Sequence, residues 1–101
     1  MKTLVVDDEL VSRKKMIQIL SRFGQCDSVK NGKAALSVVK TAIEEQTPYD
    51  LITLDISMPD IKGTEVLNQV RILEKSSAPD DSMRARILMV TSHSDVATVK
   101  A

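Results

Sequence analysis

The sequence has few aromatic, proline and glycine residues and a single cysteine. Its 101 residues include one Tyr, one Phe and no Trp, so an aliphatic core is expected. Because Cys26 stands alone, a disulfide within the chain and a metal site built from several thiolates are excluded. A lone thiol is typical of a reducing compartment, which favours the cytoplasm. The length is that of one small domain.

An excess of charge and a long hydrophobic run are also missing. Fourteen basic residues balance fourteen acidic ones, so no net field draws the chain to nucleic acid or to an anionic membrane, and no direct nucleic-acid contact is predicted. The apolar start, residues 1–6, is interrupted by Asp7, Asp8 and Glu9. It is too short for a signal peptide or a membrane span, and no membrane contact is expected.

Short apolar runs alternate with longer segments of helical periodicity. Strands are predicted at 4–6, 26–29, 51–54 and 87–90. Helices are predicted from about 10 to 24, from Asn31-Gly32 to Thr47-Pro48, from about Thr64, and from Ser94 onward with Val96 and Val99 facing inward. The first of these helices would bury Leu10, Met16, Ile17 and Leu20. The middle of the polar stretch 74–86 is expected to be an exposed loop.

This alternation predicts an α/β fold, a doubly wound parallel sheet with helices on both faces. In such a sheet the carboxyl ends of all parallel strands lie at one edge, where open sheets have their binding sites. Asp7 and Asp8 follow the first strand, Asp55 follows the third, and Thr91 and Ser92 follow the fourth. If the first and third strands are neighbours, three carboxylates share one small cleft.

Three carboxylates in one cleft raise one another's pKa values unless a cation is present. Oxygen ligands favour Mg²⁺ or Mn²⁺. In the loop after Asp55, Met58-Pro59 favours extended backbone, which would direct a carbonyl near Ser57 to the ion, and Gly63 allows a tight entry into the next helix.

Each of these features alone also has an ordinary structural explanation. Asp7 and Asp8 would serve as caps of the first helix, and Thr91 and Ser92 as caps of the last. Met58-Pro59 is common in loops, and His93 would be a solvated turn residue. Caps alone do not require acids after two strands and a hydroxyl after a third at the same edge, so the combination favours a functional site.

Three segments together resemble the receiver domain of two-component response regulators, the chemotaxis-regulator-like family. They are LVVDDE at 4–9, DISMPDIKG at 55–63 and ILMVTSH at 87–93, and with their strand and helix setting they cover the whole chain. The resemblance implies a flavodoxin-like sheet with strand order 2-1-3-4. It identifies residues 1–101 as a receiver domain that is incomplete at its C-terminus.

The resemblance also implies a role for each residue that matches the family's motifs. Asp55 would be the phosphoacceptor, and Thr91 would donate a hydrogen bond to the phosphoryl group. Asp8, Asp55 and the backbone carbonyl of Ser57 would bind Mg²⁺ or Mn²⁺ directly, and Asp7 through a water molecule. Ser57 and His93 occupy the two positions that tune hydrolysis of the acyl phosphate in the family.

The sequence departs from the family after the fourth strand. A receiver has a fifth strand with a phosphoryl-binding Lys and then a fifth helix, and no residue here can be assigned to that Lys; Lys100 falls in the predicted last helix. Without that strand, residues 87–90 would form an exposed apolar edge. We therefore expect an isolated chain of 101 residues to be unstable, to dimerise or to exchange strands through this edge.

The implied function is a phosphorylation-controlled signalling switch that catalyses only its own phosphorylation and dephosphorylation. Its partners would be a sensor histidine kinase or phosphotransfer protein, and a downstream protein or a C-terminal effector domain. Two alternatives remain open: a degenerate receiver that serves as a phosphorylation-independent interaction module, and, less favoured, a Mg²⁺-dependent aspartyl-phosphate hydrolase. A dinucleotide-binding domain is disfavoured because no Gly-rich loop follows the first strand.

Overall fold

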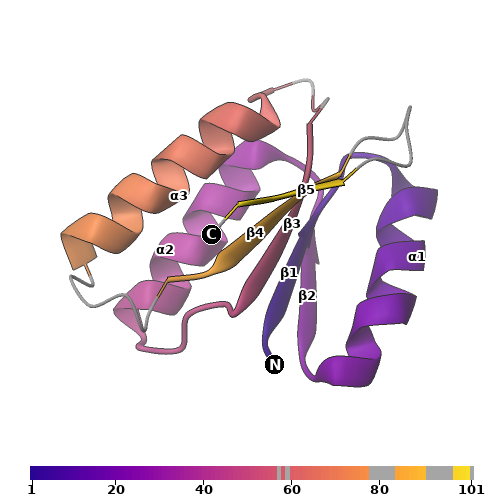
Figure 1. Ribbon diagram of the computed structural model, residues 1–101, viewed down its shortest axis with the longest axis horizontal. Helices are drawn as coiled ribbons and strands as arrows, with labels where there is room; N and C mark the ends of the chain where they lie inside the picture. Colours follow the sequence, from indigo (N-terminus) through magenta and orange to yellow (C-terminus); the bar gives the residue numbers. More distant parts are fainter. Residues whose placement is uncertain (57, 59, 78–83, 91–96, 101) are drawn as a thin grey trace.

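The computed structural model describes residues 1–56, 58, 60–77, 84–90 and 97–100. Along the chain they form β1 (Thr3–Val6), α1 (Leu10–Leu20), the short 3-10 helix η1 (Ser21–Phe23), β2 (Cys26–Val29), α2 (Gly32–Glu44), β3 (Leu51–Asp55), α3 (Gly63–Ser77), β4 (Arg86–Val90) and β5 (Ala97–Lys100). The strands form one sheet in the order β2-β1-β3-β4-β5 (Figure 1).

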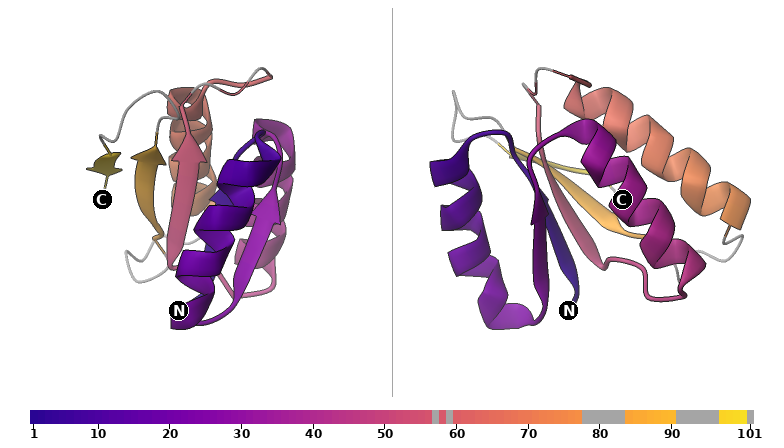
Figure 2. Two further views of the ribbon diagram at one scale, coloured as in Figure 1. Left: turned by 90° about the vertical axis from the view of Figure 1, so that its right-hand side faces the viewer. Right: turned by 180° about the vertical axis from the view of Figure 1, so that it is seen from behind.

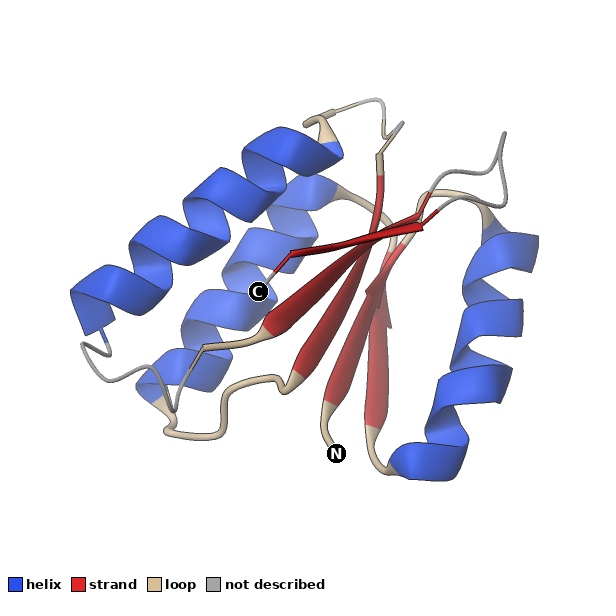
Figure 3. Cartoon of the chain, in the orientation of Figure 1, coloured by secondary structure: helices blue, strands red, loops and turns tan. Residues whose placement is uncertain are grey.

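The first four strands are parallel, in the order 2-1-3-4 that was expected. Helix α1 lies on one face of the sheet, and α2 and α3 lie on the other (Figures 2 and 3). The doubly wound α/β fold is therefore confirmed. Among the described residues, no helix is long and apolar enough to cross a membrane.

The main core lies between the sheet and the pair α2 and α3. Alternate residues of the three central strands face this side and are almost completely buried, and α2 and α3 cover them with their own buried apolar residues. The residues that the strands contribute are Leu4, Val6, Ile52, Leu54, Ile87 and Met89. Because aliphatic residues make up nearly all of this core, the expectation from the scarcity of aromatics is confirmed.

Helix α1 was predicted correctly, but its burial was not. Met16, Ile17 and Leu20 are only half-buried, and Leu10 is 53% exposed. Its apolar residues are not confined to one stripe: Val11 and Ile19 are exposed as well. A helix whose apolar residues are distributed around its axis cannot bury all of them against one face of a sheet.

The prediction of a helix from Ser94 onward is wrong for the residues that the structure describes. Ala97–Lys100 forms β5, which is antiparallel to β4, while residues 94–96 lie outside the described ranges. Thr98 and Val99 are β-branched and favour a strand, and a segment of eight residues is too short for a helix to be stable without extensive packing.

Strand β5 also corrects the expectation of an exposed β4 edge. Residues 87–90 of β4 pair with residues 97–100 of β5, so the backbone groups of this edge are hydrogen-bonded within the chain. The expectation of an unpaired β4 edge is therefore wrong, while association of two chains stays a prediction. The register places Lys100 beside Ile87, at the opposite end of β4 from Val90, which pairs with Asp55.

The described residues at the two ends of the polar stretch 74–86 belong to or adjoin regular elements. Helix α3 continues to Ser77, and residues 78–83, the middle of the predicted loop, lie outside the described ranges. Glu74 is only 6% exposed. Its carboxylate accepts hydrogen bonds from Arg71 at 2.6 Å and from the backbone N–H of Ala85 at 2.6 Å, just before β4. This network links the end of α3 to the start of β4.

The amino ends of the strands are joined by a second polar cluster. The buried Tyr49 donates its hydroxyl to Asp27 at 2.6 Å, and burial, followed by this contact with Asp27, raises the pKa of Tyr49. The Lys2 ammonium lies 4.6 Å from the centre of the Tyr49 ring and donates to the carbonyl of Thr47 at 2.6 Å. Lys2 and Asp27 thus both contact Tyr49, which precedes β3 at the end opposite Asp55.

Candidate functional site at the carboxyl edge of the sheet

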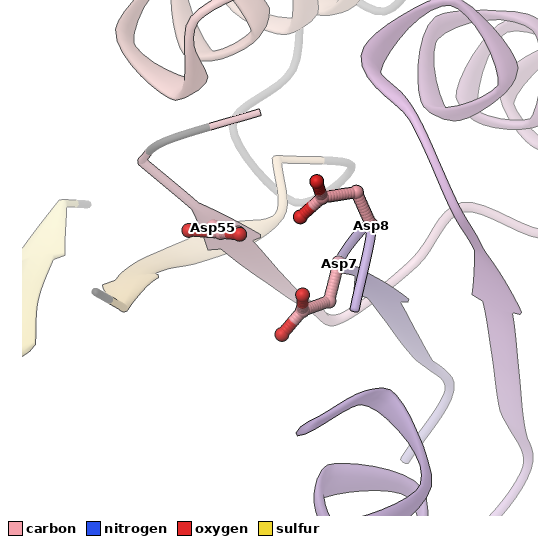
Figure 4. A group of neighbouring side chains, drawn as sticks. All are labelled: Asp7, Asp8 and Asp55. Atoms are coloured by element: carbon pink, nitrogen blue, oxygen red, sulfur yellow. The ribbon is translucent and has the colours of Figure 1, made fainter. Parts of the chain in front are cut away.

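Three carboxylates meet at the carboxyl ends of β1 and β3. One carboxylate oxygen from each of Asp7, Asp8 and Asp55 lies within 4.8 Å of the other two (Figure 4). Asp55 is 6% exposed, Asp7 is half-buried and Asp8 is exposed. The site is therefore an acidic cluster that is exposed to solvent at Asp8.

The strand register explains why these residues meet. Val6 of β1 is paired with Leu54 of β3, so the next residue of each chain segment, Asp7 and Asp55, follows at the same level. The two strands are parallel neighbours, as the resemblance implied, and both end at this edge. A rigid, buried strand therefore positions Asp55.

The turn between β1 and α1 does not use the acidic side chains as helix caps. The N-cap position of α1 is Glu9, whose side chain forms no capping hydrogen bond. Asp7 accepts a hydrogen bond from the N–H of Glu9 at 2.9 Å, before the helix begins, and Arg13 donates to the carbonyl of Asp7 at 2.8 Å. These contacts hold the turn and leave Asp8 directed to the acidic cluster.

Crowding of the carboxylates raises two pKa values. Burial is the main cause for Asp7, with the charge of Asp8 adding to it. For Asp8, loss of hydration comes first, followed by a hydrogen bond and charge repulsion from Asp55. Burial and the neighbouring acids thus disfavour the charged forms of Asp7 and Asp8. The donor set therefore fits a hard divalent cation.

A raised carboxylate pKa predicts a specific pH dependence of stability. Between the ordinary value of 3.8 and the raised values, the folded chain binds more protons than the unfolded chain. Their contribution to stability should therefore decline as the pH rises through this window, provided that no cation is present. Urea unfolding with a chelator at several pH values should show this decline, and Asp8→Asn should reduce it. An identical pH dependence in the variant would contradict the interpretation.

Gly63 packs closely against the backbone at the carboxyl end of β3. A Cβ at this position would lie 2.8 Å from the carbonyl oxygen of Asp55 and 3.1 Å from the Cα of Ile56. The tight entry into α3 expected from the sequence is confirmed. These neighbours are backbone atoms, which cannot move aside as a flexible side chain does.

Gly63→Ala is therefore expected to lower the free energy of unfolding by about 2 kcal/mol, because the added methyl group must displace β3 or α3. Chemical denaturation would measure the change. Ser76→Ala, at an exposed position of the same helix, is the control and should change the free energy of unfolding by less than about 0.5 kcal/mol. If the two variants were equally stable, the backbone around Gly63 would be able to shift at little cost in free energy.

The other predicted site residues lie outside the described ranges. They are Ser57, Thr91 and His93. Two residues near the site were not predicted: Arg13, which holds the turn after β1, and Asp60, which contacts the start of α2. Each bonds to backbone atoms of a different segment, and no periodicity or short motif in the sequence marks such a contact.

The four parallel strands in the order 2-1-3-4 define a doubly wound α/β domain. Its three clustered acids lie at the switch point, where the connections leave β1 and β3 in opposite directions. The family model for the response regulator receiver domain matches residues 3–101. The chain belongs to this family of two-component signalling domains.

Similar proteins include the histidine kinase CKI1 of Arabidopsis thaliana, which is 36% identical over 105 residues; the match covers 91% of this chain and 9% of the kinase. The solved CKI1 receiver domain in complex with Mg²⁺ and BeF3⁻ has 30% identity and a TM-score of 0.80, over 92% of this chain and 66% of that one. The response regulator domain of Thermotoga maritima CheB has 32% identity and a TM-score of 0.62, over 91% of this chain and 60% of that one. This chain thus spans only part of each of these proteins.

Proposed function

We propose that this chain is a phosphoryl-accepting signalling switch in which Asp55 takes a phosphoryl group from the phosphohistidine of a sensor kinase or phosphotransfer protein. The observation that carries the proposal is the position of Asp55, a nearly buried carboxylate at a strand end within 4.8 Å of two further acids. Membership of the receiver family and the Mg²⁺–BeF3⁻ complex of the CKI1 receiver domain support it.

Asp8 and Asp55 would bind Mg²⁺ or Mn²⁺ directly, together with the backbone carbonyl of Ser57, and Asp7 would bind through a water molecule. The geometry supports this assignment, because one carboxylate oxygen from each of the three acids lies within 4.8 Å of the other two. When bound, the cation would neutralise charge on the carboxylates and on the phosphoryl oxygens.

In the transfer step, a carboxylate oxygen of Asp55 attacks phosphorus in line with the phosphohistidine nitrogen. The new O–P bond forms as the N–P bond breaks, and the departing imidazole keeps the electron pair and takes up a proton. The residues of the chain act by position: β3 fixes the nucleophile, and the turn held by Arg13 fixes the neighbouring acids. The product is an aspartyl phosphate.

The phosphoryl group would then be sensed through the end of β4. The N–H of Ile56, next to Asp55, donates to the carbonyl of Val90 at 3.0 Å, and Val90 precedes Thr91 in the sequence. In our proposal the Thr91 hydroxyl donates to a phosphoryl oxygen, and Ser57 and His93 set the rate of hydrolysis. The new contact would favour one of two conformations of the surface around β4, and a downstream protein or an effector domain would bind that conformation. A cytoplasmic location fits this role.

Incubation with acetyl phosphate and Mg²⁺, followed by intact mass spectrometry, tests the proposal. The chain should gain one phosphoryl group, and Asp55→Asn should gain none. Asp50→Asn, at the exposed residue just before the opposite end of β3, is the matched control and should be labelled like the wild type. A folded wild-type chain that gains no adduct would instead support an unphosphorylated interaction module. Continuous release of phosphate with no retained adduct would support a hydrolase.

A further inference from the structure

The loop between β3 and α3 is attached to the first turn of α2 by a carboxylate. Asp60 accepts hydrogen bonds from the backbone N–H groups of Gly32 and Lys33, each at 3.1 Å, one to each of its oxygens. These N–H groups have no partner within their own helix. Asn31, the N-cap residue of α2, accepts from the N–H of Ala34 at 2.8 Å. The capping of α2 is therefore divided between its own N-cap and a residue 28 positions away.

Close packing at Gly32 joins the same two segments independently of these hydrogen bonds. A Cβ at Gly32 would lie 2.9 Å from the Cβ of Ile61 and 2.9 Å from Cγ2 of Val66. The side chain next to Asp60 and the first turn of α3 thus lie directly against the start of α2. The absence of a side chain at Gly32 permits this approach.

This loop also contains the proposed reaction site. The loop follows Asp55, the last residue of β3. The carbonyl of Ile56, its first residue, accepts a hydrogen bond at 3.3 Å from the N–H of Gly63, where α3 begins. Met58 is buried in the core. Asp60 is thus the attachment to α2 of the loop that includes the Ser57 carbonyl, the third cation ligand in our proposal.

We propose that Asp60 is a positioning residue: by bonding the loop after Asp55 to the first turn of α2, it holds the loop that would supply the third cation ligand. This inference rests on the proposed function of Asp55. The simpler role for Asp60 is to stabilise α2 alone. The two roles differ in what happens to the loop and to cation binding when the contact is removed.

Four variants of the full chain separate these roles. Asp60→Ala removes both hydrogen bonds. Asp60→Asn removes the charge and one of the two acceptor oxygens, so it keeps one of the two hydrogen bonds. Gly32→Ala leaves Asp60 intact and displaces the loop by the added methyl group. Asn31→Ala is the matched control, because it removes a cap of the same helix that does not touch the loop.

Mg²⁺ affinity by calorimetry and the rate of labelling by acetyl phosphate are the functional measurements. For Asp60→Ala and Gly32→Ala we expect Mg²⁺ affinity to fall about tenfold, the size typical of losing a group that orients a ligand. Asp60→Asn, which keeps one of the two hydrogen bonds, should bind Mg²⁺ with an affinity between those of Asp60→Ala and the wild type. Asn31→Ala should bind Mg²⁺ and accept phosphoryl like the wild type. Equal losses in Asp60→Asn and Asp60→Ala would indicate a charge effect, and unchanged affinity in Asp60→Ala would overturn the inference.

Hydrogen exchange tests the attachment even if the chain proves unable to accept a phosphoryl group. In Asp60→Ala the amides of Ile56 and Gly63, at the two ends of the loop, should exchange about tenfold faster, because local opening of the loop becomes easier. In Asn31→Ala they should keep their wild-type rates. If the wild-type chain neither bound Mg²⁺ nor was labelled by acetyl phosphate, the proposed function would be refuted. Unchanged exchange at both amides in Asp60→Ala would refute the role of Asp60 in holding the loop.

Discussion

Asp8→Asn is expected to weaken Mg²⁺ binding about 100-fold, because it replaces a charged ligand by a neutral one beside the cation. Asp8 lies at the exposed side of the acidic cluster, and its capping role in α1 is excluded by the geometry of the turn, since the N-cap is Glu9. Removing the charge should also relieve repulsion with Asp55. In the absence of a cation, the variant should therefore be at least as stable as the wild type.

Glu9→Gln is the matched control for this prediction. It removes one negative charge next to Asp8 in the sequence, but Glu9 is not among the three carboxylates of the cluster. Isothermal titration calorimetry measures the Mg²⁺ affinity of both variants. It distinguishes a direct ligand of the ion from an acid that only lies nearby. Losses of the same size in Asp8→Asn and Glu9→Gln would mean that Mg²⁺ responds only to the overall field of the acidic edge.

Glu74→Ala is expected to lower the free energy of unfolding by about 3 kcal/mol, because it leaves a partly buried guanidinium and a buried backbone N–H without their carboxylate partner. Glu74 accepts from Arg71 and from the N–H of Ala85, and Arg71 also donates to the carbonyl of Ala85 at 2.8 Å. The network thus sets how the end of α3 meets the start of β4, whose far end pairs with Asp55.

Glu65→Ala provides the comparison on the same helix. Glu65 is exposed and accepts a hydrogen bond from Gln69 one turn along α3, so its removal should cost less than about 0.5 kcal/mol. Urea denaturation of both variants gives the two free energies. If Glu74→Ala proved no more destabilising than Glu65→Ala, the buried network would contribute nothing beyond an ordinary surface contact.

The four parallel strands and the acids at their carboxyl ends were predictable because they depend on local patterns. Runs such as 51–54, apolar on both faces, indicate buried parallel strands, and the residue after each run must lie at the carboxyl edge. The pairing of β1 with β3 was not available from these patterns. It came from the resemblance to receivers, and it is the step that brings Asp7 and Asp8 to Asp55.

The features that were missed depend on contacts between distant segments. Ala97–Lys100 has a weak local preference, and its pairing with the free edge of β4 decides its structure. Asp60 and Glu74 look like surface acids in the sequence, but each bonds to backbone N–H groups of another element. Such contacts leave no periodic signal, because the partner is a backbone group that every residue has.

Chemical mapping of the phosphoryl group tests the role of Asp55 most directly. After labelling with acetyl phosphate and Mg²⁺, borohydride reduces an aspartyl phosphate to homoserine, and peptide mass spectrometry locates the converted residue. We predict homoserine at position 55 alone, with little conversion when Mg²⁺ is omitted or in Asp8→Asn. Homoserine at Asp7 or Asp8 in the wild-type chain, with Asp55 unchanged, would contradict the proposal.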